Sequence, residues 1–212
     1  MKKRVTGLLL IMTVVMTVFA GCGKIKFEPE TSSIYVKKDG TVISADMEPF
    51  EGSNYSEDEL KTYVENAVKA YNSAKGAPAE AYADEKDKDT VLPVKLNSLK
   101  VDKGTASLFL EYAGCGDYLT FTGTAGTEGG INRLELSTVG ETTLEGTFKN
   151  AKGEDVTLDG VTKKDSNPVV IVEGPVTMQV EGTIQFVSTG VTVDGKRTVT
   201  TPAGSVSYIV FK

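Results

Sequence analysis

The sequence has no histidine, no tryptophan and only two cysteines among its 212 residues. Without histidine, a Ser-His-Asp triad, a Cys-His pair and an imidazole zinc site are all excluded. The commonest general base near neutral pH is also missing. Without tryptophan, any aromatic platform for a sugar must come from tyrosine or phenylalanine. We therefore expect a protein that is not an enzyme, with no catalytic residue, no metal ligand and no cofactor.

The first 22 residues have the organisation of an export signal. Three basic residues at positions 2–4 precede a short apolar run over residues 5–20, which ends in Phe19-Ala20-Gly21-Cys22. A basic start, a short apolar stretch and small residues before a cut site are typical of a secretory signal peptide. The run is also shorter than the ~20 residues that a membrane-spanning helix needs.

The end of this segment resembles the lipobox of bacterial lipoproteins, although Phe19 stands where that family usually has leucine. The resemblance implies a signal peptide over residues 1–21, a lipid on Cys22 and a position on the outer face of the cytoplasmic membrane. An ordinary secretory signal with an incidental Cys22 is the alternative. If Cys22 is lipidated, Cys115 is the only remaining thiol. We expect it to be passive, because no histidine is available to activate it.

Positive charge is scarce outside the signal segment. The whole chain has 23 basic and 29 acidic residues and a net charge of −6, and removal of the three basic residues at positions 2–4 makes this −9. Such a surface repels phosphate backbones and anionic lipid. We therefore expect no nucleic-acid partner, and contact with the membrane through the lipid on Cys22. An envelope protein or a glycan is the partner that remains open.

The pattern after the signal predicts an α+β fold in several parts. Residues 22–32 are polar and are interpreted as a tether, and residues 33–113 as an α+β unit of two hairpins and one helix. Its first hairpin pairs residues 34–37 with 41–47 across Asp39-Gly40, a strong turn signal. Ser56 and Glu59 form a capping box at the start of an amphipathic helix.

The second hairpin pairs residues 91–101 with 105–112, which completes a ββαββ unit with the helix on one antiparallel sheet. Residues 114–132 are rich in glycine and threonine and are predicted to be a connector without regular structure. Residues 133–212 are predicted to be a β-rich, sandwich-like or roll-like unit without helices. Its expected strands cover residues 133–138, 142–149, 156–161, 169–172, 176–180, 184–187, 191–193, 198–201 and 207–211.

Several of these pieces together resemble a family of uncharacterised lipoproteins of anaerobic Gram-positive bacteria. They are the lipobox, the strand Ile34-Tyr35-Val36 before Asp39-Gly40-Thr41, the helix start at Ser56, and the closing strands around residues 184–188 and 207–212. The resemblance is one of pattern and implies no activity. It supplies no functional residue except Cys22.

The remaining candidate sites are weak. The acidic run over residues 84–89 alternates carboxylates as a calcium loop does, but it lacks the turn glycine and the closing glutamate, so a solvated loop is expected. Five tyrosines near the helix and the second hairpin could line a groove: Tyr63, Tyr71, Tyr82, Tyr112 and Tyr118. Core packing is expected for most of them. Tyr82 and Tyr118 lie in connectors and are the candidates for ligand contact.

Two functions stay open at this point. The first is a surface-anchored lipoprotein with a non-catalytic binding role at the cell envelope. The alternative is an envelope glycan hydrolase that uses a carboxylate pair, because such enzymes need only two well-placed acids. A concave pocket that contains two carboxylates with perturbed pKa values would favour the hydrolase.

Overall fold

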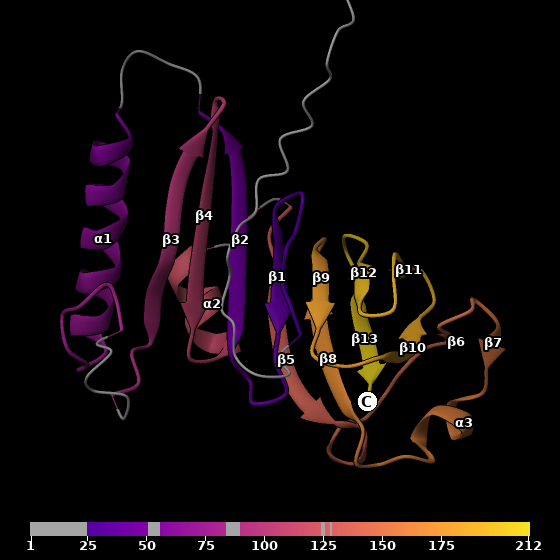
Figure 1. The fold of residues 1–212 in the computed structure, drawn as a ribbon. Coiled ribbons are helices and arrows are strands. Elements are labelled where there is room, and N and C mark those ends of the chain that lie inside the picture. The colour runs from indigo at the N-terminus through magenta and orange to yellow at the C-terminus, as the bar shows by residue number, and fades with distance from the viewer. Residues whose placement is uncertain (1–24, 51–55, 84–89, 124–125, 128) are drawn as a thin grey trace, which may run out of the picture.

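The computed structural model describes residues 25–50, 56–83, 90–123, 126–127 and 129–212. Cys22 and the acidic run over residues 84–89 lie outside the described residues. The described chain is an α+β fold with three α-helices and thirteen strands in two sheets (Figure 1). One helix packs on the first sheet, and a β-rich C-terminal region follows. The predicted fold class is therefore confirmed.

The larger sheet has seven strands in the order β11-β12-β9-β1-β2-β4-β3, and the smaller has six in the order β5-β8-β13-β10-β6-β7. The seven are β1 (Ser33–Val36), β2 (Val42–Pro49), β3 (Val94–Asp102), β4 (Thr105–Tyr112), β9 (Thr177–Val180), β11 (Thr192–Val193) and β12 (Thr198–Thr200). The six are β5 (Arg133–Thr138), β6 (Phe148–Asn150), β7 (Asp155–Val156), β8 (Pro168–Glu173), β10 (Ile184–Ser188) and β13 (Val206–Phe211). The helices are α1 (Glu57–Ala74), α2 (Cys115–Thr122) and α3 (Leu158–Thr162), with a 3₁₀ turn at Val139–Glu141.

The ββαββ unit forms as its turn signals predict. β1 pairs antiparallel with β2 through a turn in which Gly40 has φ +90°, and the Asp39 side chain accepts a hydrogen bond from the Thr41 N–H at 3.0 Å. β4 pairs with both β2 and β3 in antiparallel register. The two hairpins therefore make one sheet, with β4 inserted between β2 and β3.

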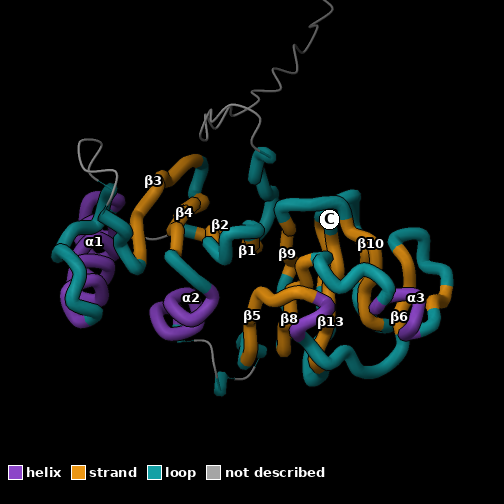
Figure 2. The backbone as a smooth tube through the Cα atoms, turned by 90° about the horizontal axis from the view of Figure 1, so that it is seen from below, coloured by secondary structure: helices purple, strands orange, loops and turns teal. Residues whose placement is uncertain are grey.

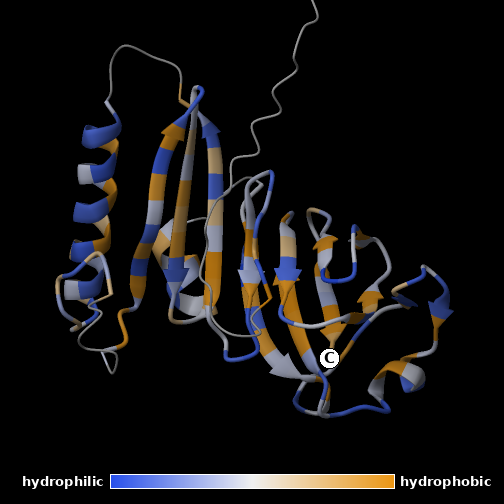
Figure 3. Cartoon of the chain, in the orientation of Figure 1, coloured by the Kyte–Doolittle hydropathy of each residue, from blue (hydrophilic) through white to orange (hydrophobic). Residues whose placement is uncertain are grey.

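The helix α1 begins at the predicted capping box and packs against β3, the edge strand (Figure 3). Val64 and Val68 are buried on the side that faces the sheet, whereas Tyr63 is 73% exposed. Tyr63 therefore does not take part in the core packing that was expected for most of the five tyrosines. Because α1 contacts mainly one edge strand, its buried stripe is narrow, and a side chain about 100° around the helix stays in water.

A polar side chain joins α1 to β3, the edge strand of the sheet. Asn72 is fully buried, and its side-chain amide pairs with the backbone of Val94 on β3. Its Nδ2 donates to the Val94 carbonyl oxygen at 2.8 Å, and the Val94 N–H donates to its Oδ1 at 2.9 Å. The same Nδ2 donates to the Glu80 carbonyl oxygen at 2.8 Å. The amide thus satisfies edge groups that would otherwise be left unpaired.

The C-terminal strands contribute to both sheets. β9 pairs in parallel with β1, so that Ile34 lies opposite Met178, and β12 and β11 extend the same sheet beyond β9. The other C-terminal strands form the six-stranded sheet. Figure 2 shows this sheet and α2 on one side of the seven-stranded sheet. A single apolar core contains residues from both sheets, among them Val36 and Phe211. The predicted units over residues 33–113 and 133–212 therefore share a sheet and a core.

The predicted connector over residues 114–132 contains the helix α2, which the sequence did not indicate. Glycine flanks the helix at positions 114 and 123, and Gly116 lies within it, so local propensity is poor. Packing stabilises it instead. Cys115, Tyr118 and Leu119 recur with helical spacing and contact the shared core. The hydroxyl of Tyr71 on α1 donates to Asp117 Oδ1 at 3.0 Å, which ties the two helices together.

A second difference concerns residues 142–161, for which the pattern predicted two strands. Only the short β6 and β7 form here, and α3 occupies residues 158–162. The side chain of Thr157 caps α3 by accepting a hydrogen bond from the Gly160 N–H, and Val161 is fully buried. A Ser/Thr cap competes effectively with strand pairing in so short a segment. The segment covers the outer side of the six-stranded sheet, where Val161, Phe148 and Ile171 form a second core cluster.

Residues 25–32, the described part of the predicted tether, contact the folded body. Phe27 is only 6% exposed and packs against Tyr35 and Phe109 on the outer face of the seven-stranded sheet. Gln179 donates to the Lys26 carbonyl oxygen at 2.9 Å, and the Met47 N–H donates to Ser32 at 2.9 Å. Among the described residues, no helix is long and apolar enough to cross a membrane.

Candidate functional site

A pocket of about 570 Å³ opens where β1, β2, α2 and the loops before β5 and β9 meet, and we call it the junction pocket. Its size is within the range of small-molecule sites. Its lining is mixed: two acids, several hydroxyls, one tyrosine and an apolar floor. The lining residues are Ser32, Ser33, Ile34, Asp46, Glu48, Tyr118, Gly129, Gly130, Ile131, Pro175, Val176, Thr177 and Thr200.

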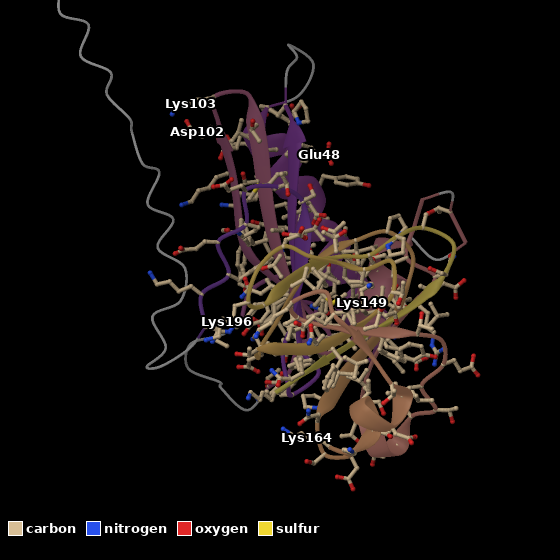
Figure 4. All side chains as sticks on the ribbon, turned by 90° about the vertical axis from the view of Figure 1, so that its right-hand side faces the viewer. Glu48, Asp102, Lys103, Lys149, Lys164 and Lys196 are labelled. Atoms are coloured by element: carbon tan, nitrogen blue, oxygen red, sulfur yellow. The ribbon has the colours of Figure 1, made fainter. Side chains whose placement is uncertain are left out.

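The acids of the junction pocket come from the inner face of β2. Ser44, Asp46 and Glu48 alternate onto that face, where Ser44 is buried and the two acids reach the pocket. Figure 4 labels Glu48 near the end of β2. Polar side chains on the inner face of a core strand are costly unless they are hydrogen-bonded or hydrated. Their position therefore indicates that the sheet here faces a wet cavity.

A chain of hydroxyls connects Asp46 to the core. Ser44 Oγ donates to Asp46 Oδ2 at 3.0 Å and lies 3.3 Å from the hydroxyl oxygen of Tyr112. Because the Ser44 hydroxyl has one hydrogen, Tyr112 acts as the donor in the second bond. The Asp46 side chain is exposed to solvent, but the surrounding protein removes part of the hydration of its carboxyl group, and this desolvation raises its pKa. The nearby charge of Glu48 raises that pKa further, while the Ser44 hydrogen bond opposes the shift.

Tyr118, one of the two tyrosines selected from the sequence, lies in this pocket. Its side chain is 7% exposed, and its ring packs edge-to-face on Tyr112 with the ring centroids 5.2 Å apart. Burial, with a smaller contribution from the Asp46 charge, raises the Tyr118 pKa to about 12, so its hydroxyl stays neutral. Within the described part of the chain, no hydrogen-bond partner is found for this hydroxyl. It is available to a ligand.

Tyr82, the second selected tyrosine, lies elsewhere. It is 43% exposed, and its hydroxyl donates to Glu65 Oε1 on α1 at 2.7 Å. Partial burial and this carboxylate raise its pKa to about 12. Tyr82 is not part of the junction pocket lining. The structure therefore does not bring Tyr82 and Tyr118 into one site, and the hydrogen bond gives Tyr82 a role in holding the loop after α1.

A close backbone crossing shapes one wall of the junction pocket. Gly174 has φ +127°, and a Cβ atom there would clash with the carbonyl oxygen of Gly130 and with Ile131. The Thr201 hydroxyl donates to the Gly174 carbonyl oxygen at 2.7 Å, and the Val176 N–H donates to that hydroxyl at 3.0 Å. Only glycine allows the two loops to approach this closely. The wall is thus held in place by backbone contacts.

A second concavity of about 710 Å³ lies on the outer face of the six-stranded sheet, and we call it the outer groove. Arg133 on β5 forms a two-pronged ion pair with Glu135, at 2.9 and 2.8 Å, and the hydrogen bonds lower the Glu135 pKa. Glu141 accepts a hydrogen bond from Thr138 at 2.9 Å. These two acids of the groove thus have partners within the protein. The groove lining contains a basic side chain, Arg133, whereas the described lining of the junction pocket contains none.

The thiol of Cys115 is neutral near pH 7. The residue opens α2 and is partly buried, and this burial raises its pKa to about 11, against hydrogen bonds that favour the thiolate. A helix N-terminus alone would favour the thiolate, but desolvation outweighs it here. Among the described residues, no group of three or more histidine, cysteine, aspartate or glutamate side chains could hold a metal ion.

Sequence reasoning missed Asp46 and Glu48. In the sequence they are two of 29 acids, and they fall near the end of a predicted strand. A signal was present, since Val42, Ser44, Asp46 and Glu48 share one side of an alternating strand and become polar towards its end. Its meaning depends on β1, α2 and the Gly130 loop, which the chain brings to the same place only by folding.

The chain was compared with known proteins at three levels. No family model matches the sequence, and neither the curated proteins nor the solved structures gave a significant match.

Proposed function

We propose that the chain is a lipoprotein held by Cys22 at the outer face of the cytoplasmic membrane, and that its folded body binds a small ligand in the junction pocket without transforming it. The anchoring rests on the lipobox Phe19-Ala20-Gly21-Cys22 and on the resemblance to uncharacterised lipoproteins of anaerobic Gram-positive bacteria. The binding rests on one observation above all: Tyr118 is nearly buried, lines a pocket and leaves its hydroxyl without a partner in the described chain.

A non-catalytic role agrees with the chemistry that the pocket offers. It contains hydroxyls and two acids, and the chain as a whole has no histidine. The nearby Cys115 thiol is not ionised near neutral pH. Hydrogen-bonding groups around an apolar floor are what a binding site requires. The ligand would reach the pocket from the space outside the membrane, and partners such as an envelope protein or a glycan fit this location.

Anchoring is tested by membrane fractionation of cells that express the wild type, Cys22→Ala and Cys115→Ala. Cys22→Ala should appear in the medium or remain unprocessed. Cys115→Ala should stay with the membrane, because only Cys22 is the cysteine of the lipobox. A correctly cleaved Cys22→Ala protein that still needs detergent for release would contradict lipidation.

Binding is tested separately, by ligand-observed NMR with a fragment collection and the full chain in non-ionic detergent. Fragments that bind the wild type in the junction pocket should bind Tyr118→Phe more weakly, since this change removes only a hydroxyl. If no fragment distinguishes the two proteins, the pocket is not a ligand site.

Glycan hydrolysis is the second candidate function, and the carboxylate pair of Asp46 and Glu48 is the feature that favours it. The two acids are two residues apart on one strand face, a spacing of roughly 6.8 Å along a strand, and Asp46 has a raised pKa beside another carboxylate. Glycosidases use carboxyl pairs about 5–9.5 Å apart. A glycosidase and muramidase panel tests this. Turnover above a heat-inactivated control, lost in Asp46→Asn, would replace the binding proposal.

A further inference from the structure

We infer that the ligand of the junction pocket is a small organic cation, with an ammonium group on a short apolar body. This deepens the proposed function, on which it rests for the assignment of the pocket as a ligand site. Three features of one cavity of the described chain point to this ligand: two acids without a basic partner, a nearly buried tyrosine whose hydroxyl has no hydrogen-bond partner, and an apolar floor.

The charge of the pocket is the first argument. Asp46 and Glu48 line it, and its described lining contains no lysine or arginine. Two partly buried acids elsewhere in the described structure, Glu111 and Asp117, do have a basic partner. Lys95 Nζ lies 2.7 Å from a carboxylate oxygen of Glu111, and Lys75 Nζ lies 3.3 Å from Asp117. A concave wall with uncompensated carboxylates focuses negative potential and attracts cations. The ligand would therefore supply the missing positive charge.

Tyr118 gives the second, independent argument. Its side chain is 7% exposed, its ring is held edge-to-face on Tyr112, and its hydroxyl has no partner in the described chain. A tyrosine hydroxyl can accept a hydrogen bond from an N–H group. Asp46 and Tyr118 both line this cavity. An ammonium group, with three N–H donors, can bind a carboxylate and a hydroxyl together.

The floor of the pocket argues for an organic cation rather than a metal ion. Ile34, Ile131 and Val176 contribute apolar surface to the lining. A hydrated divalent ion gains nothing from such a surface, and two acids are fewer than the oxygen ligands that calcium needs. The described residues likewise contain no group of three metal-binding side chains. A hydrocarbon body next to the charge would instead displace water from the floor.

The experiment compares butylammonium with 1-butanol, a neutral molecule of the same length. Each is titrated by ligand-observed NMR against the full chain in non-ionic detergent at pH 7. We expect saturable binding of butylammonium that is at least about tenfold tighter than that of 1-butanol, because one well-placed charge-assisted hydrogen bond has that effect. Asp46→Asn should remove most of this difference. Tyr118→Phe should weaken butylammonium binding several-fold.

Glu141→Gln is the matched control, because it changes one acid to an amide in the outer groove. It should leave butylammonium binding unchanged. The pH dependence is a further readout. The titratable groups around Asp46 are Glu48 on its own strand, Tyr112 on β4 and Tyr118 on α2, and burial raises the pKa of both tyrosines, so neither ionises at acid pH. Binding should therefore weaken as acid protonates Asp46, at a pH above its ordinary pKa of 3.8.

The outcomes separate this inference from the proposed function. Equal binding of butylammonium and 1-butanol, or butylammonium binding that Asp46→Asn does not weaken, would show that the ligand is not a cation, while the junction pocket would remain a ligand site. Absence of saturable butylammonium binding would also refute the proposal that the ligand is a cation. In that case a neutral disaccharide is titrated in parallel. If it binds and Tyr118→Phe weakens it, the proposed function stands, and if it does not bind, the proposed function fails too.

Discussion

Replacement of Asn72 by alanine is expected to be among the most damaging single changes in this protein. The side chain makes three hydrogen bonds, two to Val94 and one to the Glu80 carbonyl oxygen, all between 2.8 and 2.9 Å. Val94 is fully buried, so its N–H and C=O would lose their partners without gaining water. Glu80 is exposed, and its carbonyl group can turn to solvent.

Each buried backbone group left without a partner costs about 1–3 kcal/mol. For the two groups of Val94 the loss is ~2–6 kcal/mol, and the better helix propensity of alanine returns ~0.7 kcal/mol at most. We therefore expect a loss of about 3–4 kcal/mol in the free energy of unfolding, a large part of the usual ~5–15 kcal/mol. At a slope of roughly 2 kcal/mol per molar urea, the midpoint falls by ~1.5–2 M.

Asn66→Ala is the matched control, since Asn66 lies on the same helix and is exposed. It should change the free energy of unfolding by less than ~0.5 kcal/mol. Asn72→Asp should also be severe at pH 7, because a carboxylate would replace the amide donor opposite two carbonyl oxygens, and it should recover in part as acid protonates it. A single unpaired buried group costs at least about 1 kcal/mol. If the unfolding free energies of Asn72→Ala and Asn66→Ala differ by less than this, the hydrogen bonds of Asn72 to the backbone of β3 do not stabilise the fold.

Three further changes test other parts of the fold. Val64→Asp should lower the free energy of unfolding by several kcal/mol in a urea titration, because it puts an unpaired charge between α1 and β3. The control Lys61→Asp changes an exposed residue and should lower it by less than ~0.5 kcal/mol. Equal effects of the two changes would mean that the buried face of the helix is misassigned. Phe27→Ala should lower stability by ~3 kcal/mol in the same assay, and no effect would mean that the segment before β1 is a free tether. Burial alone would raise the pKa of Glu111, but Lys95 and Lys37 hold it below its usual 4.5. Its stabilisation is therefore complete above pH 4.5 and is lost as the pH falls through the lowered pKa. In thermal melts at a series of pH values, Glu111→Gln should reduce the fall of the melting temperature below pH 4.5. A fall of the same size in the variant would refute a stabilising ion pair at Glu111.

The local elements of this protein can be predicted from its sequence alone. Asp39-Gly40 sets the first hairpin, because a tight turn needs positive φ, and Ser56 with Glu59 starts α1, because the capping box satisfies free N–H groups locally. The β-rich character of residues 133–212 also follows from alternation. These features depend on neighbours a few residues apart, which a sequence displays directly. The absence of histidine likewise limits the chemistry whatever fold the chain adopts.

The remaining features depend on contacts between distant parts of the chain. α2 forms in a glycine-rich segment because Tyr118 and Leu119 find apolar partners that come from distant strands. The parallel pairing of β1 with β9 joins Ile34 to Met178, and no local pattern encodes it. The junction pocket depends on both events, because Asp46 becomes a site residue only when α2 and the loop at Gly130 close around β2. Sequence spacing carries no information on such distances, so the pocket is a property of the fold.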